Sequence, residues 1–151
     1  MKITVILFIL IGMLISGCKY EPIYSSKETN FQITKIEIKS KNEKNLNIQK
    51  KLNVYTNLNS SKKIELEIDS EKIITSSSRD TLGNIKKFDM EIIVTLIKSQ
   101  KGKANEKVIF SENFKYNNTS NKFDLKKYEN NIQQNLTNKI FQEMLLYLSS
   151  I

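Results

Sequence analysis

The sequence predicts an α/β fold: a two-layer sandwich with a four-stranded mixed sheet and two helices on one face, in the order β-α-β-β-β-α. Two observations lead to this fold class. Four segments alternate apolar and polar residues, as strands do, whereas two others repeat apolar residues every three or four positions, as amphipathic helices do. The chain shows no internal repeat and no second domain, so we expect one folded domain over residues 31–151.

The first two predicted elements are a strand and a helix. The strand covers residues 31–39, and its apolar phase changes between Ile33 and Ile36, which indicates a bulge. The helix is expected over residues 43–58, and Asn42 just before it is a typical N-cap residue. Its apolar residues recur at intervals of four and three: Ile48, Leu52 and Tyr55.

Three further strands are expected over residues 62–77, 85–98 and 106–116. The middle one carries apolar residues on both faces, which is typical of a central, well-covered strand. Residues 80–84 and 99–103 contain the glycine and polar residues of tight turns. Residues 99–103 are expected to form a hairpin turn, and the sequence leaves the order of the strands in the sheet open.

A long helix is expected over residues 123–149, where apolar residues form a stripe at helical spacing. The stripe consists of Leu125, Tyr128, Ile132, Leu136, Ile140, Met144 and Leu148. So broad a stripe is more typical of a core than of a groove for a lipid or cofactor. We therefore expect the helix to cover the sheet, which leaves the opposite sheet face exposed or bound to something.

The N-terminal segment has the pattern of a bacterial lipoprotein signal peptide. Lys2 precedes the apolar run Ile3–Ile15, and two small residues follow before Cys18, the only cysteine. We expect residues 1–17 to be removed, the Cys18 thiol to take a diacylglycerol, and residues 18–30 to act as a lipidated tether. A membrane-spanning helix is the alternative, but it needs about 20 apolar residues. An uncleaved signal with an ordinary thiol is a second alternative.

The residue types present argue against an enzyme. The chain has no histidine and a single cysteine, which removes the commonest zinc and copper sites and the usual nucleophile–base pairs. A hydrolase without histidine is a rare alternative, and neither the Gly-x-Ser-x-Gly nor the Ser-x-x-Lys motif occurs. We therefore expect no catalytic residue, no metal and no cofactor.

The net charge of +8 has two readings that the sequence does not separate. Basic proteins attract phosphate-bearing partners such as nucleic acid, lipid headgroups or lipopolysaccharide. The alternative is codon bias, because the chain is rich in Lys, Asn and Ile and has a single arginine. Secretion argues against nucleic acid in either case.

Three short motifs and the C-terminal helix together resemble one family of bacterial lipoproteins. Residues 18–24 (Cys-Lys-Tyr-Glu-Pro-Ile-Tyr) resemble the start of the mature family members. Residues 78–82 (Ser-Arg-Asp-Thr-Leu) resemble the segment before the family's central strand, and residues 114–117 (Phe-Lys-Tyr-Asn) resemble the end of its last strand. The C-terminal helix also matches in place and pattern. Together these features resemble the LptE family of lipopolysaccharide-assembly lipoproteins, in its alphaproteobacterial form.

The resemblance implies an outer-membrane lipoprotein without enzyme activity. Such a protein plugs and helps assemble the β-barrel LptD, and assists transport of lipopolysaccharide and its insertion into the outer leaflet. Its implied partners are LptD, lipopolysaccharide and the membrane that holds its lipid anchor, with no nucleic acid. The domain is expected on the periplasmic side or inside the barrel lumen. Lys19 agrees with the outer membrane, because an Asp there often marks retention in the inner membrane. The alternative is an auxiliary lipoprotein of a lipid-trafficking ABC transporter.

The resemblance implies lipopolysaccharide as a partner, and the anionic phosphates of its lipid A part give the basic residues a candidate role. Arg79 could hold a phosphate through two parallel hydrogen bonds, or it could be a turn residue paired with Asp80 or Asp89. Five lysines in or near the strand connections could form a basic patch, or could be ordinary solvated surface. The candidate lipopolysaccharide-binding residues are Arg79, Lys86, Lys87, Lys101, Lys103 and Lys107.

Overall fold

The computed structural model describes residues 30–150; the expected signal peptide, Cys18 and nearly all of the expected tether lie outside these residues. Its elements are β1 (Gln32–Ile38), α2 (Glu43–Leu52), the 3-10 helix η2 (Asn53–Thr56), β2 (Lys63–Arg79), β3 (Ile85–Ser99), β4 (Glu106–Asn117) and α3 (Lys122–Ser149). The strands form one sheet in the order β1-β2-β3-β4. β1 pairs parallel with β2, because α2 carries the chain back between them, and the other pairs are antiparallel.

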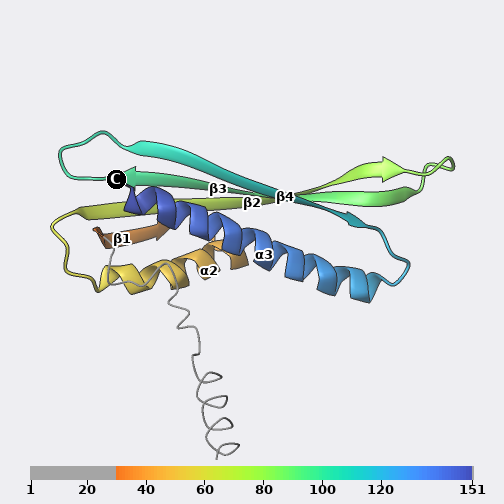
Figure 1. Cartoon of the computed structure of the whole chain (residues 1–151), viewed down its shortest axis with the longest axis horizontal. Helices are drawn as coiled ribbons and strands as arrows, with labels where there is room; N and C mark the ends of the chain where they lie inside the picture. The colour runs from red at the N-terminus through yellow and green to blue at the C-terminus, as the bar shows by residue number, and fades with distance from the viewer. Residues whose placement is uncertain (1–29, 151) are drawn as a thin grey trace, which may run out of the picture.

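The core lies between one face of this sheet and the two helices α2 and α3 (Figure 1). Alternation places every second residue of β3 in the core, and Met90, Ile92, Val94 and Leu96 are all fully buried. From the helix layer, Ile48 of α2 and Ile140 and Met144 of α3 are equally buried. This confirms the predicted fold class: a mixed four-stranded sheet with two helices on one face.

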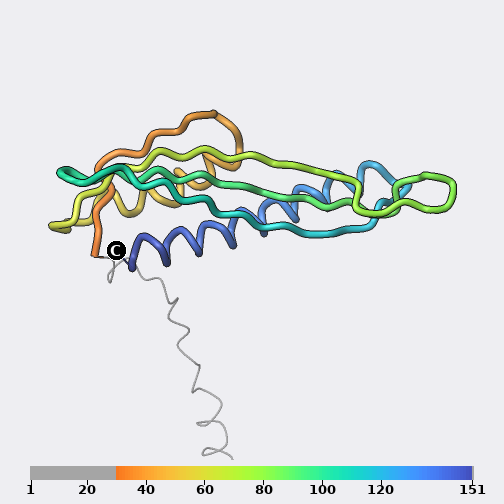
Figure 2. Tube along the Cα trace, turned by 90° about the horizontal axis from the view of Figure 1, so that it is seen from above, coloured from red at the N-terminus to blue at the C-terminus, as the bar shows by residue number. Residues whose placement is uncertain are grey.

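The molecule is long and twisted, and its two ends are built from different connections (Figures 1 and 2). We define the proximal end by Asn30, where the described chain begins, the loop 57–62 and the β3–β4 turn 100–105. We define the distal end by the β2–β3 turn 80–84. β3 has 15 residues, which corresponds to about 50 Å of strand, and the 28 residues of α3 correspond to about 42 Å of helix.

Two local predictions near the N-terminus are confirmed and one is wrong. The pairing of β1 with β2 shifts between Ile33 and Lys35, which is the expected bulge. Asn42 caps α2, because its side-chain oxygen accepts a hydrogen bond of 2.9 Å from the Asn45 N–H. A single α-helix was expected over residues 43–58, but the α-helix ends at Leu52 and the 3-10 helix η2 follows it directly. The sequence Asn-Val-Tyr-Thr of η2 explains this, because these residue types are weak helix formers.

The apolar stripe of α3 faces the sheet as expected, except near its N-terminal end. Leu125, Ile132 and Leu136 are buried, but the Tyr128 side chain is 47% exposed. Phe114 on β4 is 44% exposed as well. The sheet's twist carries the β2–β3 hairpin away from α3 at this end, so that fewer strands lie over the helix (Figure 1).

Candidate functional site

The distal turn is organised by the side chain of Asp80. Its Oδ1 accepts hydrogen bonds from the N–H groups of Leu82 (3.0 Å) and Asn84 (2.8 Å), and Oδ2 accepts one from the Asn84 side chain. The Asn84 side chain, the Asn84 N–H and the Leu82 N–H lower the pKa of Asp80 from its ordinary value of 3.8. Gly83 has a φ of +84°, a left-handed conformation that glycine adopts without a steric penalty. The turn is therefore well defined, and Leu82 at its apex is 85% exposed.

Arg79 binds this turn from the end of β2. Its Nη1 donates a hydrogen bond of 2.9 Å to the Gly83 carbonyl, and its Nη2 lies 3.5 Å from the Ser76 hydroxyl. Within the described residues Arg79 forms no ion pair with a carboxylate, so the alternative partners Asp80 and Asp89 do not neutralise it. The exposed guanidinium keeps further N–H donors that an anion could reach.

Lys86 and Lys87 lie at the start of β3, on the same distal end as Arg79. Lys87 is paired with Ser78 on β2 and with Asn117 on β4, and both lysines are exposed. The Lys86 carbonyl accepts a hydrogen bond of 2.8 Å from the Asn118 N–H, which fixes the start of the β4–α3 loop against β3. Arg79, Lys86 and Lys87 are called the distal basic group below.

The other three candidate lysines lie at the proximal end. Lys101 and Lys103 flank Gly102 in the β3–β4 turn, where Gly102 has a φ of +81° and the Lys103 N–H donates to the Gln100 carbonyl at 3.0 Å. Lys107 lies on β4, opposite Ile97 of β3. The structure thus divides the six candidates into two groups, separated by most of the length of β3, about 40 Å.

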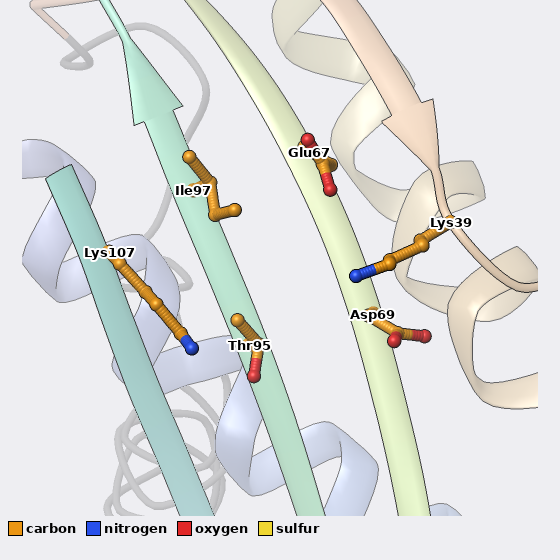
Figure 3. Close-up of a pocket in the computed structure, with 6 residues that line it drawn as sticks. All are labelled: Lys39, Glu67, Asp69, Thr95, Ile97 and Lys107. Carbon is orange, nitrogen blue, oxygen red and sulfur yellow. The ribbon is translucent and has the colours of Figure 1, made fainter. Parts of the chain in front are cut away.

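Lys107 also lines a hollow on the sheet face that neither helix covers (Figure 3). The hollow has a volume of about 120 Å³ and is lined by Lys39, Glu67, Asp69, Thr95, Ile97 and Lys107. Lys39 points toward the two carboxylates, and Lys107 points toward Thr95. A hydrogen bond of 2.5 Å from the Ser40 hydroxyl is the main cause that lowers the pKa of Asp69. The hollow thus holds charges of both signs.

A buried lysine was missed at the sequence level. Lys98 of β3 is 6% exposed, and its Nζ lies 2.6 Å from a carboxylate oxygen of Glu106 on β4 and 5.2 Å from the centre of the Tyr147 ring. Burial lowers the pKa of Lys98, but the interactions of its ammonium group with Glu106 and Tyr147 together outweigh this effect and raise the pKa overall. The available signal was its phase, because Lys98 continues the core-facing alternation of Val94 and Leu96.

A small apolar groove separates β4 from α3 near the distal end. Its volume is about 160 Å³, and it is lined by Phe114, Tyr128, Asn131, Ile132, Asn135 and Leu136.

Within residues 30–150, no group of three or more Asp, Glu, His or Cys side chains is placed to hold a metal ion. No helix in this part of the chain combines the length and the apolar character that crossing a membrane requires.

The fold and its surfaces define a class: a two-layer α/β domain with one uncovered sheet face, and this class includes solved structures of bacterial lipoproteins. Rare lipoprotein B from Shewanella oneidensis superposes with a TM-score of 0.54 at 12% identity, over 73% of this chain and 92% of that one. A minor lipoprotein from Acinetobacter baumannii gives a TM-score of 0.60 at 12% identity, over 79% of this chain and 90% of that one.

A third similar structure is an uncharacterized lipoprotein B from Nitrosomonas europaea, with a TM-score of 0.60 at 9% identity, over 86% of this chain and 92% of that one. No family model and no curated protein matches the sequence. At identities of 9–12%, these similarities establish a shared fold. The chain therefore has the fold of rare lipoprotein B, as the resemblance to the LptE family implied; the alphaproteobacterial form stays a prediction.

Proposed function

We propose that this chain is an outer-membrane lipoprotein of the LptE type, which plugs an LptD-type β-barrel, helps it assemble and assists insertion of lipopolysaccharide into the outer leaflet. The observation that carries the proposal is the fold shared with rare lipoprotein B and with two further lipoproteins. The lipoprotein signal pattern that ends at Cys18 supports it independently, because it is read from the sequence and not from the fold.

The dimensions of the domain suit a plug. A bilayer is about 40–45 Å thick including its headgroups, and β3 and α3 extend for about 50 Å and 42 Å. A domain of this length, aligned with a barrel axis, would reach from one side of the membrane to the other.

The uncovered sheet face also suits a barrel lumen. Lumens of membrane barrels are polar, whereas their outer walls are apolar. The uncovered face of β2 presents Glu65, Glu67 and Asp69, which alternate with the buried Ile64, Leu66 and Ile68. These charged groups would stay hydrated or hydrogen-bonded beside a polar wall and would be costly against lipid.

The lipid anchor would orient the plug. Cys18 precedes Asn30, at the proximal end, so anchoring in the periplasmic leaflet would direct the distal end toward the outer leaflet. The distal basic group would then meet arriving lipopolysaccharide, and Arg79 could hold one of its phosphates with two N–H donors. One lipid A headgroup cannot contact both basic groups, which are about 40 Å apart. The role requires no covalent chemistry, no metal and no cofactor.

Crosslinking and pulldown of the tagged lipoprotein from outer membranes, with mass spectrometry of its partners, tests this function. A stoichiometric β-barrel of the LptD type is the expected result, together with loss of surface lipopolysaccharide after depletion of the lipoprotein. Recovery of an inner-membrane ATPase complex without any barrel would contradict the proposal and favour the transporter-auxiliary alternative. A Cys18→Ser chain is the control for capture that does not depend on the anchor.

A further inference from the structure

We infer that the proximal end is a second, electrostatic membrane contact: Lys62, Lys63, Lys101 and Lys103 face the phosphate headgroups of the leaflet that holds the acyl chains of Cys18. These residues are called the four proximal lysines. The inference rests on the proposed function in one respect, the lipidation of Cys18. It assigns Lys101 and Lys103 to the supporting leaflet rather than to lipopolysaccharide.

The fold brings these lysines together from separate parts of the chain. Lys62 and Lys63 stand at the start of β2, where the Lys62 carbonyl accepts a hydrogen bond of 2.8 Å from the Gln32 N–H of β1. Lys101 belongs to the β3–β4 turn, and the pairing of Glu65 with Ser99 sets that turn beside β2. Lys63, Gln100 and Lys101 line one open hollow of about 470 Å³. Figures 1 and 2 show both connections at the same end of the molecule.

The charge at this end is almost entirely positive. Residues 57–63 and 99–105 contain the four proximal lysines and no acidic residue. Within residues 30–150 none of these four lysines forms a salt bridge; the three ion pairs join Lys35 to Glu37, Lys98 to Glu106 and Lys139 to Glu112. Glu65 is the one carboxylate that lines the hollow. The positive charge of this end is therefore available to an anionic surface.

The position of the anchor selects a membrane as that surface. The described chain begins at Asn30, whose carbonyl accepts a hydrogen bond of 2.8 Å from the Ser60 hydroxyl in the loop just before Lys62. Twelve peptide steps separate Asn30 from Cys18, so the chain between them can span at most about 40 Å. An acylated Cys18 would hold the four proximal lysines within that distance of headgroup phosphates. Val54 of η2, near this end, is 56% exposed, and basic residues beside exposed apolar ones are typical of membrane interfaces.

Lysine footprinting on the acylated protein tests the inference. The mature lipoprotein is reconstituted into vesicles of phosphatidylcholine alone or with added phosphatidylglycerol, and a water-soluble reagent acetylates exposed amines before mass spectrometry. Each lysine that lies near an anionic membrane surface strengthens binding to that surface about fivefold. We therefore expect acetylation of Lys63, Lys101 and Lys103 to slow about fivefold when phosphatidylglycerol is present. Lys86 and Lys87 at the distal end are internal controls, and their rates should not change.

Two variants separate a specific contact from general attraction. Lys101→Glu with Lys103→Glu should abolish the slowing at Lys63, whereas the matched Lys86→Glu with Lys87→Glu should preserve it. About 1 M salt, where the Debye length is about 3 Å, should also abolish it. Equal rates in both vesicles, equal slowing at both ends, or protection only after a barrel protein is added would overturn the inference. Flotation with phosphatidylcholine vesicles reports the acyl anchor separately, so failure of the proposed lipidation is distinguishable from failure of this contact.

Discussion

Lys98 and Glu106 form an asymmetric ion pair across the β3–β4 hairpin: their charged atoms lie 2.6 Å apart, and the side chains are 7% and 51% exposed. The lysine is thus taken out of water while its partner stays hydrated. Removing the partner of a buried charge costs more than replacing the charge itself by an apolar group, because the remaining charge is left unpaired. Lys98 and Glu106 are register partners at the end of the hairpin whose turn carries the proximal lysines Lys101 and Lys103.

Substitution of Lys98 and substitution of Glu106 should therefore lower the stability of the fold by different amounts. We expect Lys98→Met to change the free energy of unfolding by no more than about 1 kcal/mol, because Met fills a similar volume without a charge. Glu106→Gln should lower stability more than Lys98→Met. Urea unfolding followed by circular dichroism measures both. A Glu106→Gln protein as stable as the unmodified chain would contradict the expectation.

The same pair predicts a dependence of stability on pH. The hydrogen bond from Lys98 lowers the pKa of Glu106 from its ordinary value of 4.5. A carboxyl group whose folded pKa is depressed stabilises the fold above its unfolded pKa, and this contribution disappears as the pH falls through the folded pKa. Stability should hence decline below about pH 4.5, and Glu106→Gln should reduce the slope there. Thermal melts from about pH 3 to about pH 7, in steps of about one pH unit, measure how stability depends on pH. Identical slopes in the Glu106→Gln protein and the unmodified chain would contradict the expectation.

Truncation of a core side chain should destabilise the fold in proportion to its burial. Ile92 of β3 is fully buried, whereas Ile109 of β4 is 58% exposed on the uncovered face. We expect Ile92→Ala to cost about 2–5 kcal/mol, since it leaves a cavity between the sheet and the helices. The matched Ile109→Ala should cost less than about 1 kcal/mol. Chemical denaturation measures the free energy of unfolding of both variants. Similar losses of stability would show that the uncovered face is also packed.

Arg79 should contribute to lipopolysaccharide binding, because its guanidinium can donate two parallel hydrogen bonds to one phosphate. We expect Arg79→Ala to weaken binding of purified lipopolysaccharide about fivefold, the size of one exposed ion pair, and Arg79→Lys to restore only part of it. Lys50→Ala, an exposed lysine on α2 away from the distal turn, is the control. Unchanged affinity in Arg79→Ala would leave Arg79 with its hydrogen bond to Gly83 alone, as a turn residue.

Cys18 should decide where the protein is found. A Cys18→Ser chain lacks the thiol that the diacylglycerol requires, so it should leave the membrane fraction and run without the mass of the acyl chains. Stable anchoring takes more than one acyl chain, and the basic proximal end alone should hold the protein only at low salt. Fractionation with intact-mass spectrometry measures this, and a membrane-bound, unmodified Cys18→Ser protein would argue for a spanning signal segment.

Much of the fold could be predicted from local patterns. Alternation along residues 85–98 reports which side of a strand is buried, and helical spacing along residues 123–149 does the same for α3, because both patterns depend only on residues near in sequence. The end of α2 at Leu52 was harder, since weak helix propensities shift a helix end without changing its apolar spacing. The exposure of Tyr128 depended on the twist of the sheet, which no local pattern encodes.

The candidate site was only partly predictable. Composition pointed to the basic residues, and turn chemistry placed Arg79 and Lys101 at connections. That these two residues lie at opposite ends of a long sheet follows from the hairpin lengths and register, which tertiary pairing decides. Lys63 was not among the candidates, because it comes to line one hollow with Lys101 only after β2 and β3 have paired.

The sequence by itself determined the expected lipoprotein signal, the strands and helices, and the absence of histidine, because each is written in neighbouring residues or in the composition. Only the tertiary structure decided which charges gather, which face of the sheet stays uncovered, and that Lys98 is buried against Glu106. The physical reason is that burial and ion pairing depend on distances between residues far apart in the chain, and those distances exist only after the sheet and helices pack.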